Sequence, residues 1–162
     1  MTKSNGAIKK AISREIIKRF NIKQRGKIKI EKASKHNKYK IKLVNKNYFI
    51  YLHENESSQN CEKIILKKIE KAKVIAPRII CTGSIFNGEY YYNIVSEVKI
   101  KPIAYQKIDG YDKIAVKIFE ELKKIHSIKE GSKCLIHGDL NVKNICCNKK
   151  DIAFLPVLPY AN

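Results

Sequence analysis

Hydrophobic residues recur at helical spacing in three stretches of the chain. In the first, isoleucine or phenylalanine stands at every fourth position and forms a single apolar stripe, with Asn5 as the capping residue. In the second, the stripe consists of Cys61, Ile65, Ile69 and Ala72. We therefore predict helices from about Asn5 to Phe20, from Ser58 to Ala72 and from Tyr111 to Ser127.

Strand patterns fill most of the remaining chain. Apolar and polar residues alternate between Lys27 and Lys32, and short runs of β-branched and aromatic residues follow. The pairs Asn45-Lys46 and Asn87-Gly88 separate neighbouring runs and predict tight hairpins. The predicted strands are 27–32, 40–44, 47–52, 78–82, 90–98, 133–136, 145–147 and 152–155.

This order of elements predicts an α+β fold. The strands between Lys27 and Val98 should form one antiparallel sheet, with the helix Ser58–Ala72 packed on one face. The order differs from the β-α-β alternation of Rossmann and P-loop folds, and the phosphate-binding motif G-x-x-x-x-G-K-[ST] does not occur in the sequence.

Composition places the chain among globular proteins. Hydrophobic residues make up 44% of the 162 residues and charged residues 30%, which is too apolar for a disordered chain and suits one domain or slightly more. The sequence has neither the run of about 18 apolar residues that a membrane span needs nor an N-terminal secretory signal. Its cysteines show no zinc-ligand spacing, so we expect reduced thiols in a cytoplasmic protein.

The net charge of +19 admits two explanations. It points to nucleic acid, an anionic surface or a phosphorylated ligand as a partner. However, most of the 34 basic residues are lysines spread along the chain, and isoleucine, asparagine and tyrosine are abundant too, as in proteins encoded by AT-rich genomes. Charge alone therefore does not decide between a selected polyanion-binding surface and a background bias of composition.

The segment Leu135–Ile145, with the sequence LIHGDLNVKNI, carries the clearest chemical signal. An Asp and an Asn stand five residues apart in a loop between two short apolar strands, an arrangement used in phosphoryl transfer. The Asp accepts the proton of the attacking hydroxyl, and the Asn carbonyl oxygen suits a hard magnesium ion beside the phosphates. The candidates for these roles are Asp139 and Asn144, with His137 and Gly138 shaping the loop.

This segment resembles the catalytic loop of the aminoglycoside phosphotransferase and choline kinase branch of the protein-kinase-like superfamily. That branch has the pattern H-G-D-[LF]-x-x-x-N, matched here by His137, Gly138, Asp139, Leu140 and Asn144. The resemblance implies a protein-kinase-like fold with ATP and Mg²⁺ as cofactors. It also implies that His137 and Asp139 are catalytic residues, with Asp139 as the base, and that Asn144 is a metal ligand.

The resemblance extends in order along most of the chain. Residues Ser34–Asn37 stand where the family has its phosphate-covering turn, which assigns Ser34 and Asn37 to cofactor binding. Residues Val95–Val98 correspond to the hinge that holds adenine, which adds Glu97 and Val98. The implied domains are an N-lobe over 1–98, with the antiparallel sheet, and a minimal, truncated helical C-lobe over 99–162.

Three features depart from the family pattern. The first is the phosphate-binding lysine of the third strand, because Tyr51 occupies its approximate position. Lys42 and Lys46 lie nearby in the sequence, and we take Lys42 as the best substitute. Glu62, on the following helix, is the natural carboxylate partner for such a lysine, although a solvated helix residue would fit the same pattern.

The other two departures concern the end of the chain. Pro156 stands where the family has a magnesium-chelating Asp, and proline has no ligand atom in its side chain, so we expect catalysis to fall by orders of magnitude. The chain also ends soon after Asn144, where the family continues with several helices. We therefore expect a small second core, covered by a protein partner or by a homo-oligomer contact.

Three functions remain open at this point. The chain could be a catalytically impaired relative of kinases that phosphorylate a small-molecule hydroxyl, an active compact kinase, or a basic module that binds nucleic acid or a protein partner. The expected partners are a nucleotide and an unidentified small-molecule acceptor, with no membrane. The excess of basic over acidic residues, 34 against 15, argues against a polycationic aminoglycoside as the acceptor.

Overall fold

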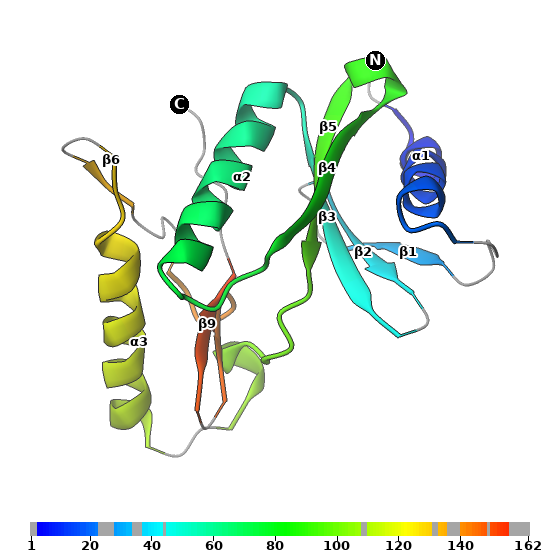
Figure 1. Cartoon of the computed structure of the whole chain (residues 1–162). Coiled ribbons are helices and arrows are strands. Elements are labelled where there is room, and N and C mark those ends of the chain that lie inside the picture. The colour runs from blue at the N-terminus through cyan, green and yellow to red at the C-terminus, as the bar shows by residue number, and fades with distance from the viewer. Residues whose placement is uncertain are drawn as a thin grey trace. The chain divides into compact units, whose positions relative to one another are not determined.

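The computed structural model describes residues 3–22, 28–33, 37–43, 45–107, 110–130, 133–135, 140–148 and 150–155. The chain divides into two compact units, Met1–Asn60 with Ile79–Glu97 and Cys61–Arg78 with Val98–Asn162. The helices, drawn in Figure 1, are α1 (Asn5–Arg19), α2 (Glu56–Lys71) and α3 (Tyr111–His126), with the 3-10 helices η2 (Phe86–Gly88) and η3 (Ile103–Tyr105). The strands are β1 (Lys29–Lys32), β2 (Lys38–Lys42), β3 (Asn47–His53), β4 (Ile79–Ile85), β5 (Tyr90–Ser96), β6 (Lys129–Glu130), β7 (Lys133–Cys134), β8 (Ile145–Cys147) and β9 (Ile152–Phe154).

The first unit contains a five-stranded antiparallel sheet with the strand order β1-β2-β3-β5-β4. The predicted sheet is thus confirmed. Leu43 and Lys46 close the β2–β3 hairpin, because Leu43 N donates to Lys46 O at 2.9 Å, so Lys46 belongs to the closing pair and the predicted Asn45-Lys46 turn is out by one residue. The β4–β5 hairpin turns at η2, where Asn87 adopts φ 56°, a left-handed conformation that asparagine tolerates.

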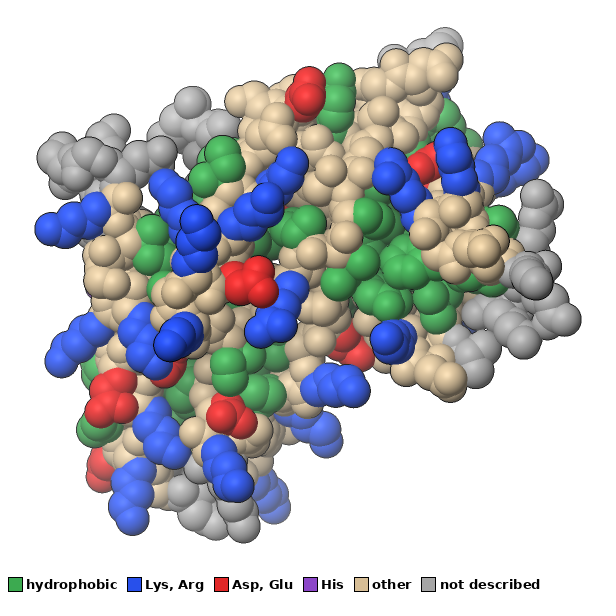
Figure 2. All heavy atoms as spheres, viewed as in Figure 1, with side chains coloured by type: hydrophobic (Ala, Val, Ile, Leu, Met, Phe, Trp, Pro, Cys, Tyr) green, Lys and Arg blue, Asp and Glu red, His purple; other side chains and the backbone are tan. Residues whose placement is uncertain are grey.

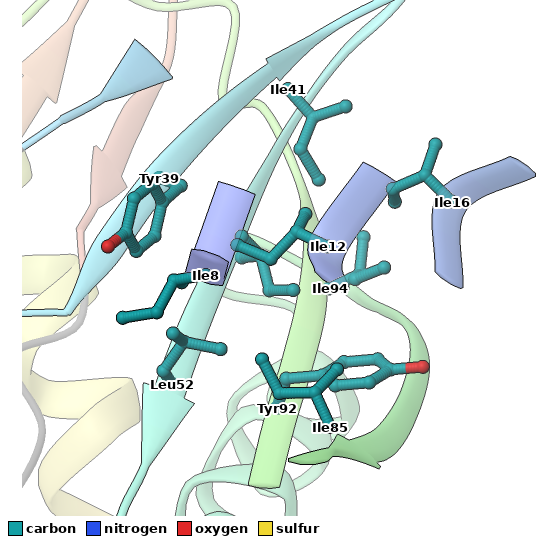
Figure 3. Close-up of a cluster of buried hydrophobic side chains, with 10 residues drawn as sticks. Ile8, Ile12, Ile16, Tyr39, Ile41, Leu52, Ile85, Tyr92 and Ile94 are labelled. Carbon is teal, nitrogen blue, oxygen red and sulfur yellow. The ribbon is translucent and has the colours of Figure 1, made fainter. Parts of the chain in front are cut away.

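Helix α1 covers one face of this sheet. Ser4 caps the helix, because its side-chain oxygen accepts from the Ala7 backbone N–H at 3.3 Å, and Asn5, the predicted cap, is instead the first helical residue. The predicted apolar stripe is buried against the sheet (Figure 3), and each fully buried isoleucine contributes about 2 kcal/mol. The cluster includes Ile8, Ile12 and Ile16 of α1 with Tyr39, Ile41, Ile50, Leu52, Tyr92 and Ile94 of the sheet.

Tyr92 of β5 crosses the neighbouring strand at Gly83. The two residues are paired in the β4–β5 register, and a Cβ atom at position 83 would lie 2.5 Å from the Tyr92 hydroxyl oxygen. That hydroxyl donates to Glu15 of α1 at 2.8 Å, and burial together with this hydrogen bond raises the pKa of Tyr92. Glycine at position 83 therefore leaves the space through which the tyrosine ring reaches α1.

The buried face of α2 differs from the predicted cysteine and isoleucine stripe. Cys61 is exposed, and the buried face passes instead through Gln59, Glu62, Leu66 and Ile69. A polar contact fixes the start of the helix, since the Gln59 side-chain amide donates to the carbonyl oxygens of Gly83 and Tyr92 at 3.0 and 2.6 Å. These bonds turn Gln59 toward the sheet and leave Cys61 on the outer side.

The second unit is built around α3 and the β8–β9 hairpin, both close to their predicted bounds. Leu122 and Ile125 of α3 share one hydrophobic cluster with Ile145, Ile152 and Phe154. The β9 strand also runs beside residue 75, because Phe154 N donates to the Ile75 carbonyl oxygen at 3.0 Å. A second short hairpin, β6–β7, follows α3, and its first strand was not predicted.

Most of α2 belongs to this second unit, whereas the sequence predicted one boundary near residue 98. Ile69 and Val74 lie in the hydrophobic cluster that contains α3 and the β8–β9 hairpin, which explains the difference. The chain therefore passes from one unit to the other within α2, after Asn60, and again after Arg78 and after Glu97.

Candidate functional site

Three lysines stand on one face of β2. Lys38, Lys40 and Lys42 alternate with Tyr39 and Ile41, which are buried in the cluster with α1, so the lysine side chains project from the opposite face of the sheet. We name these three residues the lysine row. In the β2–β3 register their partners are Tyr51, Phe49 and Asn47, respectively.

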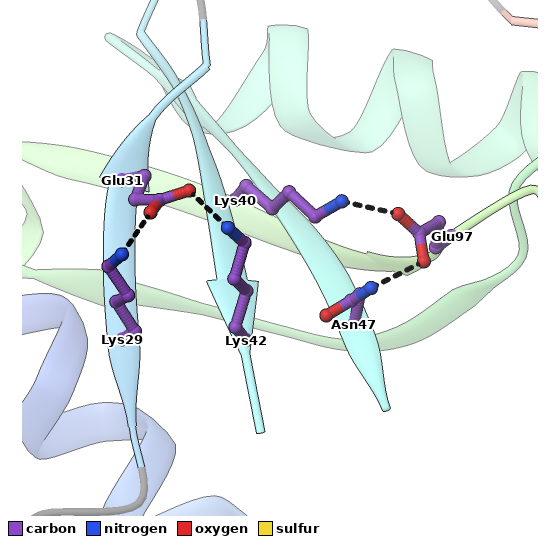
Figure 4. Close-up of polar contacts among 6 residues, drawn as sticks. All are labelled: Lys29, Glu31, Lys40, Lys42, Asn47 and Glu97. Carbon is purple, nitrogen blue, oxygen red and sulfur yellow. Dashed lines mark hydrogen bonds and ion pairs between the residues drawn. The ribbon is translucent and has the colours of Figure 1, made fainter. Parts of the chain in front are cut away.

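Lys42, the predicted phosphate-binding residue, takes part in an ion-pair group. Its Nζ lies 2.8 Å from one carboxylate oxygen of Glu31, and the Nζ of Lys29 lies 2.8 Å from the other (Figure 4). Hydrogen bonds from Lys29 and Lys42 lower the pKa of Glu31 to about 2. Glu31 is therefore ionised at neutral pH and balances part of the charge of both lysines.

Glu97, predicted for the hinge, joins the end of β5 to two other strands. Its carboxylate oxygens accept from Lys40 Nζ at 2.6 Å and from Asn47 Nδ2 at 2.7 Å (Figure 4). These side chains are partly buried, so their charge-assisted bonds are stronger than those between fully exposed groups. The bonds fix the chain just before Val98, the other predicted hinge residue, which is half-buried.

Lys38 lies beside two aromatic rings. Its Nζ is 4.6 Å from the centroid of the Phe49 ring and 4.9 Å from that of the Tyr51 ring, distances at which a cation is attracted to a ring face. Tyr51 is only 8% exposed and occupies the predicted position of the missing lysine. A positive charge is thus held next to the Tyr51 ring.

The turn between β1 and β2, predicted to cover the phosphates, is described in part. Ser34 lies outside the described residues. Asn37 has φ 23°, and its carbonyl oxygen accepts from Leu52 N at 2.9 Å. This bond extends the pairing of β2 with β3 by one residue and fixes the point at which the turn joins the sheet.

Buried polar side chains connect the start of α2 with the sheet. Asn93 Nδ2 donates to the Gln59 backbone carbonyl oxygen at 3.1 Å and lies 3.5 Å from His53 Nε2. Sequence reasoning did not identify these three residues. The signal that could have found them is an amide or imidazole side chain within an otherwise apolar segment. Glu62, the predicted partner of the phosphate-binding lysine, is 2% exposed on the next turn of α2, which excludes the alternative of a solvated helix residue.

Asn141 shapes the part of the predicted catalytic loop that the structure describes. His137 and Asp139, the two predicted catalytic residues, lie outside the described residues. The Asn141 side-chain oxygen accepts from Lys143 N at 2.9 Å, and its carbonyl oxygen accepts from Asn144 N at 2.9 Å. Asn144, the predicted metal ligand, is half-buried at the end of this turn. Sequence reasoning missed Asn141, although asparagine commonly builds such turns.

The connector between β5 and α3 contacts this loop and β8 through hydrogen bonds to their backbone carbonyl oxygens. Ala104 N donates to the Val142 carbonyl oxygen at 2.9 Å. The Gln106 side-chain amide donates to the carbonyl oxygens of Lys101 at 2.6 Å and of Cys147 at 2.9 Å. The sequence predicted only a linker here, whereas these bonds make the connector a support for the loop and for β8.

The β8–β9 hairpin places Leu155 beside Asn144. Ile145 pairs with Phe154, and one residue further Leu155 N donates to the Asn144 carbonyl oxygen at 2.8 Å. Pro156, at the position predicted for a magnesium-binding Asp, follows in the sequence and lies outside the described residues. Within the described ranges, no group of three or more His, Cys, Asp or Glu side chains could hold a metal ion.

Several solved structures share this fold. Aminoglycoside phosphotransferase APH(4)-Ia matches with a TM-score of 0.57 and 11% identity, over 72% of this chain and 39% of that chain. The kinase PK-1 of Cydia pomonella granulovirus matches with a TM-score of 0.58 and 14% identity, over 87% of this chain and 54% of that chain. A proposed fructosamine-3-kinase of Haemophilus somnus 129PT matches with a TM-score of 0.51 and 19% identity, over 75% of this chain and 40% of that chain.

These matches show that the chain has the predicted protein-kinase-like fold. The chain spans between 39% and 54% of the length of those three proteins, and identities of 11% to 19% establish the fold without the activity. No protein-family model and no curated protein sequence matches it. No helix in the described part of the chain is long and apolar enough to cross a lipid bilayer.

Proposed function

We propose that this chain is an aminoglycoside phosphotransferase-like protein that binds nucleotide, and that its ancestral chemistry is ATP-dependent phosphoryl transfer to a small-molecule hydroxyl. The observation that carries the proposal is the turn that presents Asn144 at the start of the β8–β9 hairpin, in a chain with a kinase-like fold. An amide oxygen in this place, five residues after an Asp, is the arrangement that phosphoryl transfer uses.

The proposed roles follow the resemblance residue by residue. Asp139 accepts the proton of the acceptor hydroxyl, and His137 shapes the loop around it. Asn144 offers its side-chain oxygen to Mg²⁺, which when bound neutralises charge on the phosphates. The turn with Ser34 and Asn37 covers the phosphates. The backbone of Glu97 and Val98 binds the adenine, and the Glu97 side chain fixes that segment to the sheet.

We also propose that phosphoryl transfer by this chain is impaired. The resembling family has a magnesium-binding Asp at the position of Pro156, one residue after Leu155, whose backbone N–H donates to the Asn144 carbonyl oxygen. Pro156 supplies no such ligand, and Asn144 contributes only a neutral oxygen. Magnesium would then have too few anionic protein ligands to hold a fixed position, while nucleotide binding through lysine could persist.

A basic binding module is the second candidate, and one observation favours it. Lys10, Arg14 and Lys18 are exposed at four-residue spacing along the outer side of α1, which forms a basic stripe. Figure 2 shows basic side chains over much of the visible face, interspersed with hydrophobic ones rather than gathered in one block. Such a surface would suit nucleic acid, with an affinity that falls steeply as salt rises.

A thermal-shift titration with ATP, with and without Mg²⁺, tests the main proposal. We expect ATP to raise Tm by similar amounts in both conditions, and ATP turnover to match that of an Asp139→Ala variant. Robust turnover that Asp139→Ala abolishes would favour an active compact kinase. If ATP at millimolar concentration leaves Tm unchanged while RNA raises it, the basic binding module is the better description.

A further inference from the structure

Helix α3 exposes two large apolar side chains on its outer side. Phe119 is 64% exposed and Val116 57%, whereas Leu122 and Ile125 of the same helix lie in the hydrophobic cluster with the β8–β9 hairpin. Residues three apart are neighbours on a helix surface, so the exposed pair forms one apolar patch that favours contact with another surface. Neither residue belongs to the proposed nucleotide site.

Charged residues of opposite sign stand at the two ends of this pair. Asp112 precedes Val116 by four residues and Lys123 follows Phe119 by four, and both are exposed. At 3.6 residues per turn and a rise of 1.5 Å per residue, the four side chains fall within about 60° of the helix surface and over about 16 Å of its length. We name these four residues the α3 stripe, and their order is acidic, apolar, apolar, basic.

The α3 stripe is complementary to itself when two copies meet with their helices antiparallel. With the twofold axis at the middle of the stripe, Asp112 of one copy faces Lys123 of the other, and Val116 faces Phe119. A parallel arrangement would instead place Asp112 against Asp112 and Lys123 against Lys123. The charges therefore favour the antiparallel arrangement and fix its register.

A second pair of opposite charges lies beside the stripe. Lys113 and Glu120 are exposed and stand seven residues apart, so they share one side of the helix. The antiparallel arrangement brings Lys113 of one copy close to Glu120 of the other, as charges beside the apolar seam of paired helices do. The net charge of +19 opposes association, but at physiological salt it is screened beyond about 8 Å, so the directly opposed charges decide the local balance.

We propose that α3 is the contact surface of a homodimer, in which two copies of this chain pair antiparallel through the α3 stripe. Burial of the two apolar side chains of each copy supplies the affinity, and the charge pairs set the direction and register of the helices. One helix face from each copy makes a small interface, so the dimer exchanges with monomer at micromolar concentrations of protein.

Sedimentation equilibrium, from micromolar to near-millimolar protein, measures this association. Phe119→Ala should raise the dissociation constant of the dimer by about tenfold or more, because a central aromatic side chain is lost from the contact. Ile64→Ala is the matched control, since Ile64 is an apolar residue of α2 that is 50% exposed, and it should leave the dissociation constant unchanged. Circular dichroism and Tm establish that each variant is folded. A protein that stays monomeric throughout, or a Phe119→Ala variant that dimerises normally, overturns the proposal.

Charge reversal tests the antiparallel register. Asp112→Lys and Lys123→Asp should each weaken self-association, because each places like charges opposite one another in the dimer. An equimolar mixture of the two variants should associate like the unmodified protein, since both opposed pairs of the mixed dimer again have opposite signs. Lys67→Asp, a reversal at an exposed position of α2, should have no effect. A mixture that associates no better than either variant alone contradicts this register and with it the antiparallel α3 dimer.

Discussion

The backbone N–H of Leu155 donates to the carbonyl oxygen of Asn144 at 2.8 Å. This bond lies one residue beyond the Ile145–Phe154 pair and ties the end of β9 to the turn that carries the predicted metal ligand. The bond therefore holds the turn and the end of β9 together through backbone atoms.

Replacing Pro156 with aspartate should introduce the missing carboxylate. We expect Pro156→Asp to make the ATP-induced rise in Tm larger with Mg²⁺ than without it, because carboxylate oxygen is the ligand that magnesium prefers. Pro156→Ala removes the proline without adding a ligand and serves as the control. Equal magnesium responses from the two variants would show that the carboxylate is not what the site lacks.

A methyl group at position 83 should destabilise the first unit. The added Cβ would lie 2.5 Å from the Tyr92 hydroxyl oxygen, and the buried ring is held by Glu15, so we expect Gly83→Ala to lower the free energy of unfolding by about 1–3 kcal/mol. Urea denaturation measures this change. The control is Gly6→Ala in α1, where the nearest atom lies 4.0 Å away, and it should be neutral or slightly stabilising.

Truncation of a buried isoleucine in α1 should be costly. Ile12 is fully buried against the sheet, so Ile12→Ala should lower the free energy of unfolding by about 2–5 kcal/mol through lost apolar contact and a residual cavity. Ile64 of α2 is 50% exposed and provides the same substitution at an outer position, with an expected loss of about 0.5 kcal/mol. Similar losses for both variants would mean that α1 does not cover the sheet in solution.

The cysteines should differ in their reactivity. Burial raises the pKa of Cys146 to about 11 and also raises that of Cys147, so at pH 8 few of these thiols are in the reactive thiolate form. Site-resolved mass spectrometry of iodoacetamide labelling should show exposed Cys61 reacting first, with Cys146 labelled faster as the pH rises toward 11. In urea the difference should disappear, and native labelling of Cys146 as fast as Cys61 would contradict the buried hairpin.

Local patterns predicted most of the fold. The four-residue spacing of Ile8, Ile12 and Ile16 and the Asn87-Gly88 turn are each determined within a few residues, and these elements are confirmed. The rotation of α2 was not predictable in this way. It depends on the bonds from Gln59 to carbonyl oxygens of β4 and β5, more than twenty residues away in the sequence.

The candidate site was predictable only where it is a contiguous motif. The spacing of Asp139 and Asn144 is visible in the sequence, whereas the choice among lysines depends on strand register. The second strand was predicted two residues late, at 40–44 rather than Lys38–Lys42, so Lys38 fell outside it. A shift of this size changes which lysine lies opposite Tyr51.

The position of α1 has a practical consequence for anyone producing this protein. A shortened version that begins at β1 would keep the complete sheet and still lose the side chains that cover Ile41, Ile50 and Ile94. A sheet with a bare apolar face tends to associate, so we expect such a version to accumulate in inclusion bodies. Affinity tags should therefore be placed ahead of Ser4, separated by a flexible spacer that leaves its capping hydrogen bond intact.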